Sequence, residues 1–132
     1  PDLLDGATEE ILRWSTPVIY MRRTCSRDLD FHGVAMREND KLALFYTSAN
    51  RDEERFDKPF SFDIERSPNE HLAFGVGEHF CLGASLARLE IKLLFAELTQ
   101  RVERIELDGE IRRLRSNFIA GIKSLPVRYR AG

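Results

Sequence analysis

Apolar residues recur at helical spacing in two stretches of the chain. The first stretch runs from near the N-terminus to residue 14 and contains Leu3, Leu4, Ala7, Ile11 and Trp14. This period predicts an amphipathic helix, and Pro17 should end it because the residue before a proline is pushed out of the helical region. The second stretch predicts a helix from residue 82 to about residue 103. Its apolar stripe contains Leu82, Leu86, Leu89, Leu93 and Ala96.

Between the two helices the pattern changes to short strands and a long loop. Residues 18–23 and 41–46 read as strands, and the turn residues His32-Gly33 and Asn39-Asp40 lie between them. Residues 50–73 show no period and contain two prolines, which indicates a long ordered loop or a linker. After the second helix, Asp108-Gly109 predicts a turn, and residues 118–129 predict a final hairpin around Gly121 or Pro126.

Composition excludes several classes of protein. The 132 residues suffice for one domain with a modest core, and the net charge of −2 gives no positive field that would attract nucleic acid or an anionic membrane. No apolar run approaches the roughly 18 residues that span a bilayer. Only Cys25 and Cys81 are present, which makes no disulfide scaffold and favours a cytoplasmic location.

The stretch FGVGEHFCLG, residues 74–83, concentrates candidate chemistry around Cys81. It is not a dinucleotide-binding loop, because the position of the third glycine is Phe80. A zinc site that included His71, His79 and Cys81 would lack the short paired spacings typical of structural zinc. A buried structural cysteine is the common role of a lone cysteine, yet it would not need the surrounding glycines.

A haem ligand explains those glycines. A flat macrocycle can lie against the backbone only where side chains are missing, as they are at Gly75, Gly77 and Gly83. A cysteine just before a helix is also favoured as the thiolate, because the helix dipole stabilises its charge. Thiolate ligation of haem iron is the arrangement used for O–O cleavage.

The stretch resembles the cysteine-ligand loop of the cytochrome P-450 monooxygenases, F-G-x-G-x-H/R-x-C-x-G, and every fixed position is filled. The resemblance implies a mainly α fold with small β-sheets, haem b as the cofactor, and Cys81 as the iron ligand and catalytic residue. By the same resemblance Arg23 and His79 bind the haem propionates and Phe74 shields the sulfur. The implied cofactor-binding residues are Cys81, His79, Arg23, Phe74, Gly75 and Gly83.

Two further segments follow the family's order. Glu10 and Arg13 match its E-x-x-R helix, where three-residue spacing lets the side chains pair; taken alone, such a pair would be a solvated surface contact. Residues 50–66 resemble the meander that follows, with the frame Phe56, Pro59 and Phe62. One position departs from the pattern: Ser61 stands where the family has arginine or histidine, and Arg55 or Arg66 is the candidate substitute.

The resemblance implies a monooxygenase that inserts one oxygen atom of O2 into a C–H bond. Electrons would come from NAD(P)H through a ferredoxin and ferredoxin reductase or a similar donor. A basic face for that donor has the candidates Arg51, Lys58, Arg66 and Arg88. Bulky apolar residues at the substrate-lining positions, Val18, Ile19, Phe118 and Ile119, suit a steroid or lipid, although simple core packing explains them equally well. Two alternatives stay open: a haem-binding or electron-transfer module without this activity, and a remnant without haem.

The resemblance covers residues 1–132 as the C-terminal, haem-binding part of the family fold. In the family the oxygen-activating helix precedes the E-x-x-R helix, and only nine residues precede Glu10 here. We therefore expect a truncated part of a longer enzyme that hydroxylates nothing on its own. Without covering helices, Leu42, Leu44 and Phe45 should lie exposed.

Overall fold

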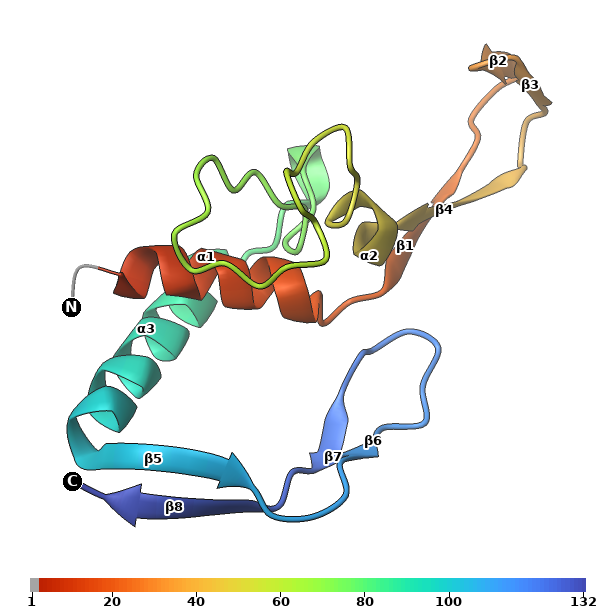
Figure 1. The fold of residues 1–132 in the computed structure, drawn as a ribbon. Helices are drawn as coiled ribbons and strands as arrows, with labels where there is room; N and C mark the ends of the chain where they lie inside the picture. The colour runs from red at the N-terminus through yellow and green to blue at the C-terminus, as the bar shows by residue number, and fades with distance from the viewer. Residues whose placement is uncertain (1–2) are drawn as a thin grey trace.

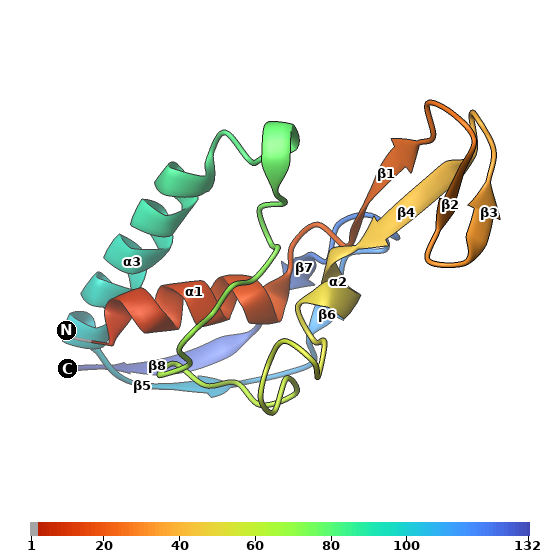
Figure 2. The ribbon, with the colours of Figure 1, turned by 90° about the horizontal axis from the view of Figure 1, so that it is seen from above.

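The computed structural model describes residues 3–132. Two helices, α1 (Leu4–Ser15) and α3 (Ala84–Arg101), lie against each other, and the short helices α2 (Tyr46–Ala49) and η1 (Gly77–His79) lie between them in sequence (Figure 1). The strands form antiparallel pairs: β1 (Tyr20–Thr24) with β4 (Lys41–Phe45), β2 (Leu29–Phe31) with β3 (Val34–Met36), β5 (Val102–Leu107) with β8 (Val127–Ala131), and β6 (Arg112–Arg113) with β7 (Ile122–Ser124). The β1–β4 pair projects away from the helices and carries β2 and β3 at its far end (Figure 2).

Both predicted helices are present. Helix α1 ends as expected at Pro17: Thr16 takes a left-handed conformation with φ 37°, and its amide donates to the Leu12 carbonyl at 3.0 Å. Helix α3 begins two residues later and ends two residues earlier than the pattern predicts. Residues 50–73 form the predicted long loop, which contains no helix or strand.

The strands are predicted less well. The segment 18–23 is a strand only from Tyr20, while Val18 makes an isolated bridge to Ile119. The predicted final hairpin is wrong, since β7 pairs with β6 and β8 pairs with β5. Local sequence cannot reveal which distant strand a segment joins. The turn at His32-Gly33 is confirmed, but the strands β2 and β3 on either side of it were missed.

The buried centre of the described residues is largely polar. It lies where α1 meets the 50–73 loop and the start of α3. The buried apolar residues are Leu12, Phe56, Ala73 and Ala84, and the buried polar ones are Thr8, Glu10, Arg13, Thr16 and Asn50. Gly6 allows α1 to approach the 50–73 loop closely, because a Cβ at this position would collide with the Ile64 carbonyl oxygen.

The leucines of the predicted α3 stripe are largely exposed, with Leu82 102% and Leu93 57% accessible. The pattern identified an apolar face, but no described element covers most of it. Of the residues expected to lie exposed on β4, Phe45 is exposed, whereas Leu42 and Leu44 are half-buried. No helix among residues 3–132 is long and apolar enough to cross a membrane.

Candidate cofactor site

A hollow of about 610 Å³ lies between β1, the start of α2 and the loop that leads into α3. Its volume is within the range of roughly 300–1,000 Å³ typical of small-molecule and cofactor sites. Two segments far apart in sequence, β1 and the cysteine loop, line opposite parts of this hollow. The lining residues are Pro17, Val18, Met21, Arg22, Arg23, Thr24, Tyr46, Ala73, Phe74, His79 and Cys81.

The cysteine loop is shaped by two glycines with left-handed backbone conformations. Gly75 has φ 71° and Gly77 has φ 77°, values that residues with a side chain rarely adopt. A Cβ at Gly75 would also lie 3.0 Å from the Tyr46 hydroxyl oxygen. The loop closes when the Cys81 amide donates to the Phe74 carbonyl at 2.9 Å. Gly83 differs, since its φ of −85° is an ordinary conformation.

Cys81 is exposed at this hollow, so it is not a buried core cysteine. Cys25 is half-buried, and its sulfur lies 3.9 Å from the Met36 sulfur, outside the hollow. Both cysteines are free thiols. Within residues 3–132, no group of three or more histidine, cysteine or carboxylate side chains is placed to hold a metal ion.

The residues lining the hollow fit haem. Cys81 offers a sulfur ligand for iron, and Arg23 and His79 are donors that suit two carboxylates. Only one hydrogen bond of the Arg23 guanidinium, to the Arg22 carbonyl at 3.0 Å, is made within the described chain. Val18 and Phe74 supply part of the apolar wall that a macrocycle needs.

The four predicted substrate-lining residues lie beside one another, but only one of them lines the hollow. Val18 bridges Ile119, and the Ile19 amide donates to the Phe118 carbonyl at 2.9 Å. Val18 lines the hollow, whereas Ile19, Phe118 and Ile119 are not among its lining residues.

Glu10 and Arg13 form a bidentate ion pair with fully buried side chains. Arg13 Nη2 lies 2.7 Å from Glu10 Oε1, and Nε lies 2.8 Å from Oε2. The remaining Arg13 donors bind backbone carbonyls, including those of Asn50 at 2.8 Å and Pro59 at 2.9 Å. A solvated surface pair is therefore excluded, and the pair fastens the 50–73 loop to α1.

Arg66 is the third charged residue of this cluster, beside Glu10 and Arg13. Its Nε lies 3.2 Å from Glu10 Oε2, and its guanidinium also donates to the Ser61 carbonyl at 3.1 Å. Of the two candidate substitutes for the missing family residue, the structure thus places Arg66 beside Glu10. Burial alone would raise the pKa of Glu10, but hydrogen bonds from Arg13 and the Asp63 amide and the nearby positive charges bring it below its ordinary value.

The pattern missed a second cluster, formed by Glu9, His71 and Arg88. Arg88 Nε lies 2.7 Å from Glu9 Oε1, and His71 Nε2 lies 3.1 Å from Glu9 Oε2. The hydrogen bond from Arg88 is the main reason that the pKa of Glu9 is lowered. Sequence reasoning considered His71 only as a metal ligand and Arg88 only as a partner-facing charge. The only local feature of the sequence that could have indicated this cluster is Glu9 itself, a second glutamate directly before Glu10.

Most residues of the predicted basic face form ion pairs or hydrogen bonds with other groups of this chain. Arg66 and Arg88 are ion-paired with Glu10 and Glu9. Arg51 donates to the Trp14 carbonyl at 2.8 Å and lies 5.1 Å from the centre of the Trp14 ring. Lys58 alone of the four candidates makes no side-chain hydrogen bond or ion pair within residues 3–132.

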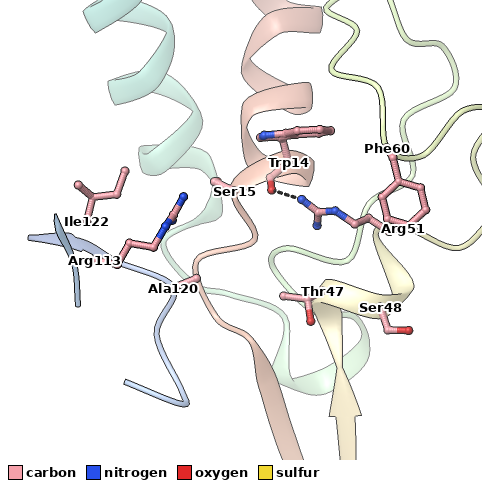
Figure 3. Close-up of a pocket in the computed structure, with 9 residues that line it drawn as sticks. All are labelled: Trp14, Ser15, Thr47, Ser48, Arg51, Phe60, Arg113, Ala120 and Ile122. Carbon is pink, nitrogen blue, oxygen red and sulfur yellow. Dashed lines mark hydrogen bonds between the residues drawn. The ribbon is translucent and has the colours of Figure 1, made fainter. Parts of the chain in front are cut away.

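A second hollow, of about 760 Å³, lies at the end of α1 beside α2 and β7. Figure 3 shows its lining, with the Arg51 side chain pointing to the Trp14 carbonyl. It contains none of the predicted cofactor residues, and no cysteine, histidine or carboxylate lines it. The lining residues are Trp14, Ser15, Thr47, Ser48, Arg51, Phe60, Arg113, Ala120 and Ile122.

Comparison with known proteins agrees with the resemblance. A family model described as cytochrome P-450 matches residues 2–126. "Methyl-branched lipid omega-hydroxylase" of Mycobacterium tuberculosis (strain ATCC 25618 / H37Rv) is 52% identical over an alignment of 128 residues that covers 96% of this chain and 30% of that protein. "Steroid C26-monooxygenase" of the same strain is 47% identical over an alignment of 130 residues that covers 96% of this chain and 33% of that protein.

Solved structures show the same likeness. CYP108D1 from Novosphingobium aromaticivorans superposes with a TM-score of 0.93 at 46% identity and covers 99% of this chain and 32% of its own. CYP109E1 from Bacillus megaterium in complex with testosterone gives 0.92 at 39% identity, covering 96% and 36%. The chain spans about a third of the length of the relatives it matches.

Proposed function

Because this chain belongs to the cytochrome P-450 family, we propose that it is the haem-binding part of a monooxygenase acting on an apolar substrate. The enzyme inserts one oxygen atom of O2 into a C–H bond of that substrate. One observation carries the proposal: the exposed thiol of Cys81 shares a hollow with Arg23 and His79. These are one iron ligand and two partners for carboxylates, and they come from segments more than fifty residues apart.

The residues have distinct roles in holding haem. Cys81 Sγ would hold the iron, Arg23 and His79 would hold the propionates, and Phe74 would shield the sulfur. When bound, thiolate-ligated haem supplies the activation of O2. We propose haem b as this cofactor, as the family resemblance implies. The positive φ of Gly75 and Gly77 shapes the turn that leads to Cys81, and a Cβ at Gly83 would lie 4.0 Å from the Cys81 sulfur.

The substrate and partners follow from the relatives and the apolar surface. The relatives named above act on methyl-branched lipids and steroids, and Val18 presents an apolar side chain to the hollow. We extend that substrate class to this chain. Electrons come from NAD(P)H through a ferredoxin and its reductase. A cytoplasmic location belongs to the same proposal, supported by the two free thiols.

The decisive test is the spectrum of the reduced, carbon-monoxide-bound protein after loading with haemin. Thiolate ligation shifts its Soret band strongly to the red. Cys81→Ser should abolish this band, while Cys25→Ser should keep it, because Cys25 lies outside the hollow. Loss of the band in Cys25→Ser with retention in Cys81→Ser would overturn the assignment of the ligand.

A second measurement separates a monooxygenase from a haem module. Added to the full-length haem-loaded enzyme that contains this chain, a methyl-branched fatty acid or a steroid should change the spin state of the iron, which shifts the ferric Soret band. A haem-loaded protein whose spectrum responds to neither compound would fit the electron-transfer alternative instead.

A further inference from the structure

Glu9 is bound from two directions by residues that flank Cys81 in sequence. Arg88, seven residues after the cysteine, donates from Nε to Glu9 Oε1 at 2.7 Å and from Nη2 to Oε2 at 2.9 Å. His71, ten residues before the cysteine, approaches Oε2 at 3.1 Å. A planar guanidinium bound in this bidentate way is held in orientation as well as in position.

The backbone fixes the hydrogen position on His71. The Ala73 amide donates to His71 Nδ1 at 3.2 Å, so Nδ1 is the acceptor and Nε2 carries the hydrogen donated to Glu9. The His71 side chain is only 2% exposed. Its pKa is lowered mainly by burial, in agreement with a neutral ring. His71 therefore ties the segment just before the cysteine loop to α1.

The contacts continue from these residues to Cys81 itself. The Arg88 guanidinium lies 4.8 Å from the centre of the Phe74 ring, a cation–π distance. The centre of the His71 ring lies 6.1 Å from the centre of the same Phe74 ring. The Phe74 carbonyl in turn accepts the Cys81 amide at 2.9 Å. A continuous path thus runs from the Glu9 carboxylate to the backbone of the cysteine.

We propose that Glu9 is the positioning residue for Cys81, holding both flanks of its loop against α1 through His71 and Arg88. Neighbouring glutamates of α1 then have different roles: Glu10 holds the 50–73 loop, whereas Glu9 binds His71 at the end of that loop and Arg88 in α3, the two segments on either side of the cysteine loop. The inference deepens the proposed function, on which the purpose of the positioning rests. A lone ion pair at this exposure would contribute little, but Glu9 joins a buried histidine, a bidentate arginine and a stacked aromatic ring.

Hydrogen exchange of the Cys81 amide tests the positioning without haem. Glu9→Gln keeps the shape of the side chain and removes its charge. It should reduce protection of the Cys81 amide about tenfold or more, as expected when charge-assisted hydrogen bonds are weakened. The Thr16 amide, which caps α1, should keep its protection. The control Glu90→Gln changes an exposed glutamate of α3 and should leave both amides unchanged.

Arg88→Lys provides an independent variant in case Glu9→Gln loosens the whole fold. It keeps the positive charge, Glu9 and His71, but loses the bidentate geometry and the stacking on Phe74. The same selective loss at Cys81 is expected. Unchanged protection of Cys81 in both variants, or uniform loss at Cys81 and Thr16 in both, would overturn the proposal.

The haem-loaded protein separates this inference from the proposed function. A wild-type chain without a red-shifted carbon-monoxide band would refute thiolate ligation while leaving the exchange result to judge the positioning. If the band is present, Glu9→Gln should diminish it and speed haem transfer to apo-globin about tenfold. A normal band and transfer rate in Glu9→Gln would show that Glu9 does not position the ligand.

Discussion

At the residue scale, the centre of this chain depends on polar groups whose hydrogen bonds are nearly all satisfied. The guanidinium of Arg13 binds the Glu10 carboxylate and carbonyls of the 50–73 loop. Desolvating two charges is costly, and this cost is offset only when the geometry is good and further hydrogen bonds form. The same arrangement makes the cluster sensitive, because removing one member leaves the other charged and buried.

Glu10→Ala should therefore lower the free energy of unfolding by about 3–5 kcal/mol, the cost of stranding a buried partner. The matched control is Glu97→Ala in the exposed Glu97–Arg101 pair of α3, which should cost no more than about 0.5 kcal/mol. Urea denaturation of both variants measures the difference. Equal stability of the two would mean that the Glu10–Arg13 pair behaves as an ordinary surface contact.

His71 should make the stability of the fold depend on pH. Its folded pKa lies below the ordinary value of 6.5, mainly because of burial. Below pH 6.5 the histidine binds a proton more readily in the unfolded chain than in the folded one. The free energy of unfolding should therefore fall as the pH drops from 6.5 toward the folded pKa. The pKa values of Glu9 and Glu10 are also lowered, from an ordinary value of 4.5, so the fold should lose further stability below pH 4.5.

Urea denaturation at about pH 7.5 and about pH 5.5 isolates the histidine, because this interval lies above the carboxylate range. His71→Gln removes the titrating group and should flatten the change between the two values. A change of equal size in wild type and His71→Gln would assign the dependence to another group.

At the element scale, sequence prediction succeeded where the signal was local. The helical periods located α1 and α3, and the glycines around Cys81 indicated a special backbone that appears as positive φ at Gly75 and Gly77. It failed at strand pairing, because β8 joins β5 on the other side of the Asp108-Gly109 turn and β7 joins β6, so β7 and β8 do not pair with each other. It also failed at Glu9, whose partners lie 62 and 79 residues away along the chain.

The turn at Gly75 gives a test of the cysteine loop as an element. Gly75→Ala should destabilise it both through the positive φ of 71° and through a Cβ placed 3.0 Å from the Tyr46 hydroxyl oxygen. Gly77→Ala shares a positive φ of 77° but meets no atom within 4 Å. We expect Gly75→Ala to be the more harmful, by roughly 1 kcal/mol or more in unfolding free energy.

Tyr46→Phe removes the hydroxyl and should restore part of the loss in Gly75→Ala, while leaving Gly77→Ala unchanged. Urea denaturation of the single and double variants gives the coupling energy directly. No coupling between positions 46 and 75 would show that backbone strain alone explains the harm.

At the scale of the whole molecule, the chain exposes more surface than a compact domain of its size. A monomer of 15.3 kDa is expected to expose about 7,100 Å², whereas this chain exposes 10425 Å². Much of the apolar surface lies on α3, where Leu86 is 59% and Leu93 57% accessible. The period of α3 was visible in the sequence, but a period reports only that a face is apolar and says nothing of what covers it.

These 132 residues should consequently self-associate when purified as they stand, because contiguous exposed apolar surface promotes association. The apparent mass in sedimentation should rise with concentration, and so should the melting temperature, since association stabilises the folded state by mass action. Replacing Leu86 and Leu93 together by glutamine should shift the equilibrium toward the monomer with little loss of stability, because both side chains are already largely in water. Glu90→Gln, on the same helix but polar, should leave association unchanged. A wild-type chain that stays monomeric at every concentration, or a leucine variant that associates as strongly as wild type, would show that the chains do not associate through the apolar face of α3.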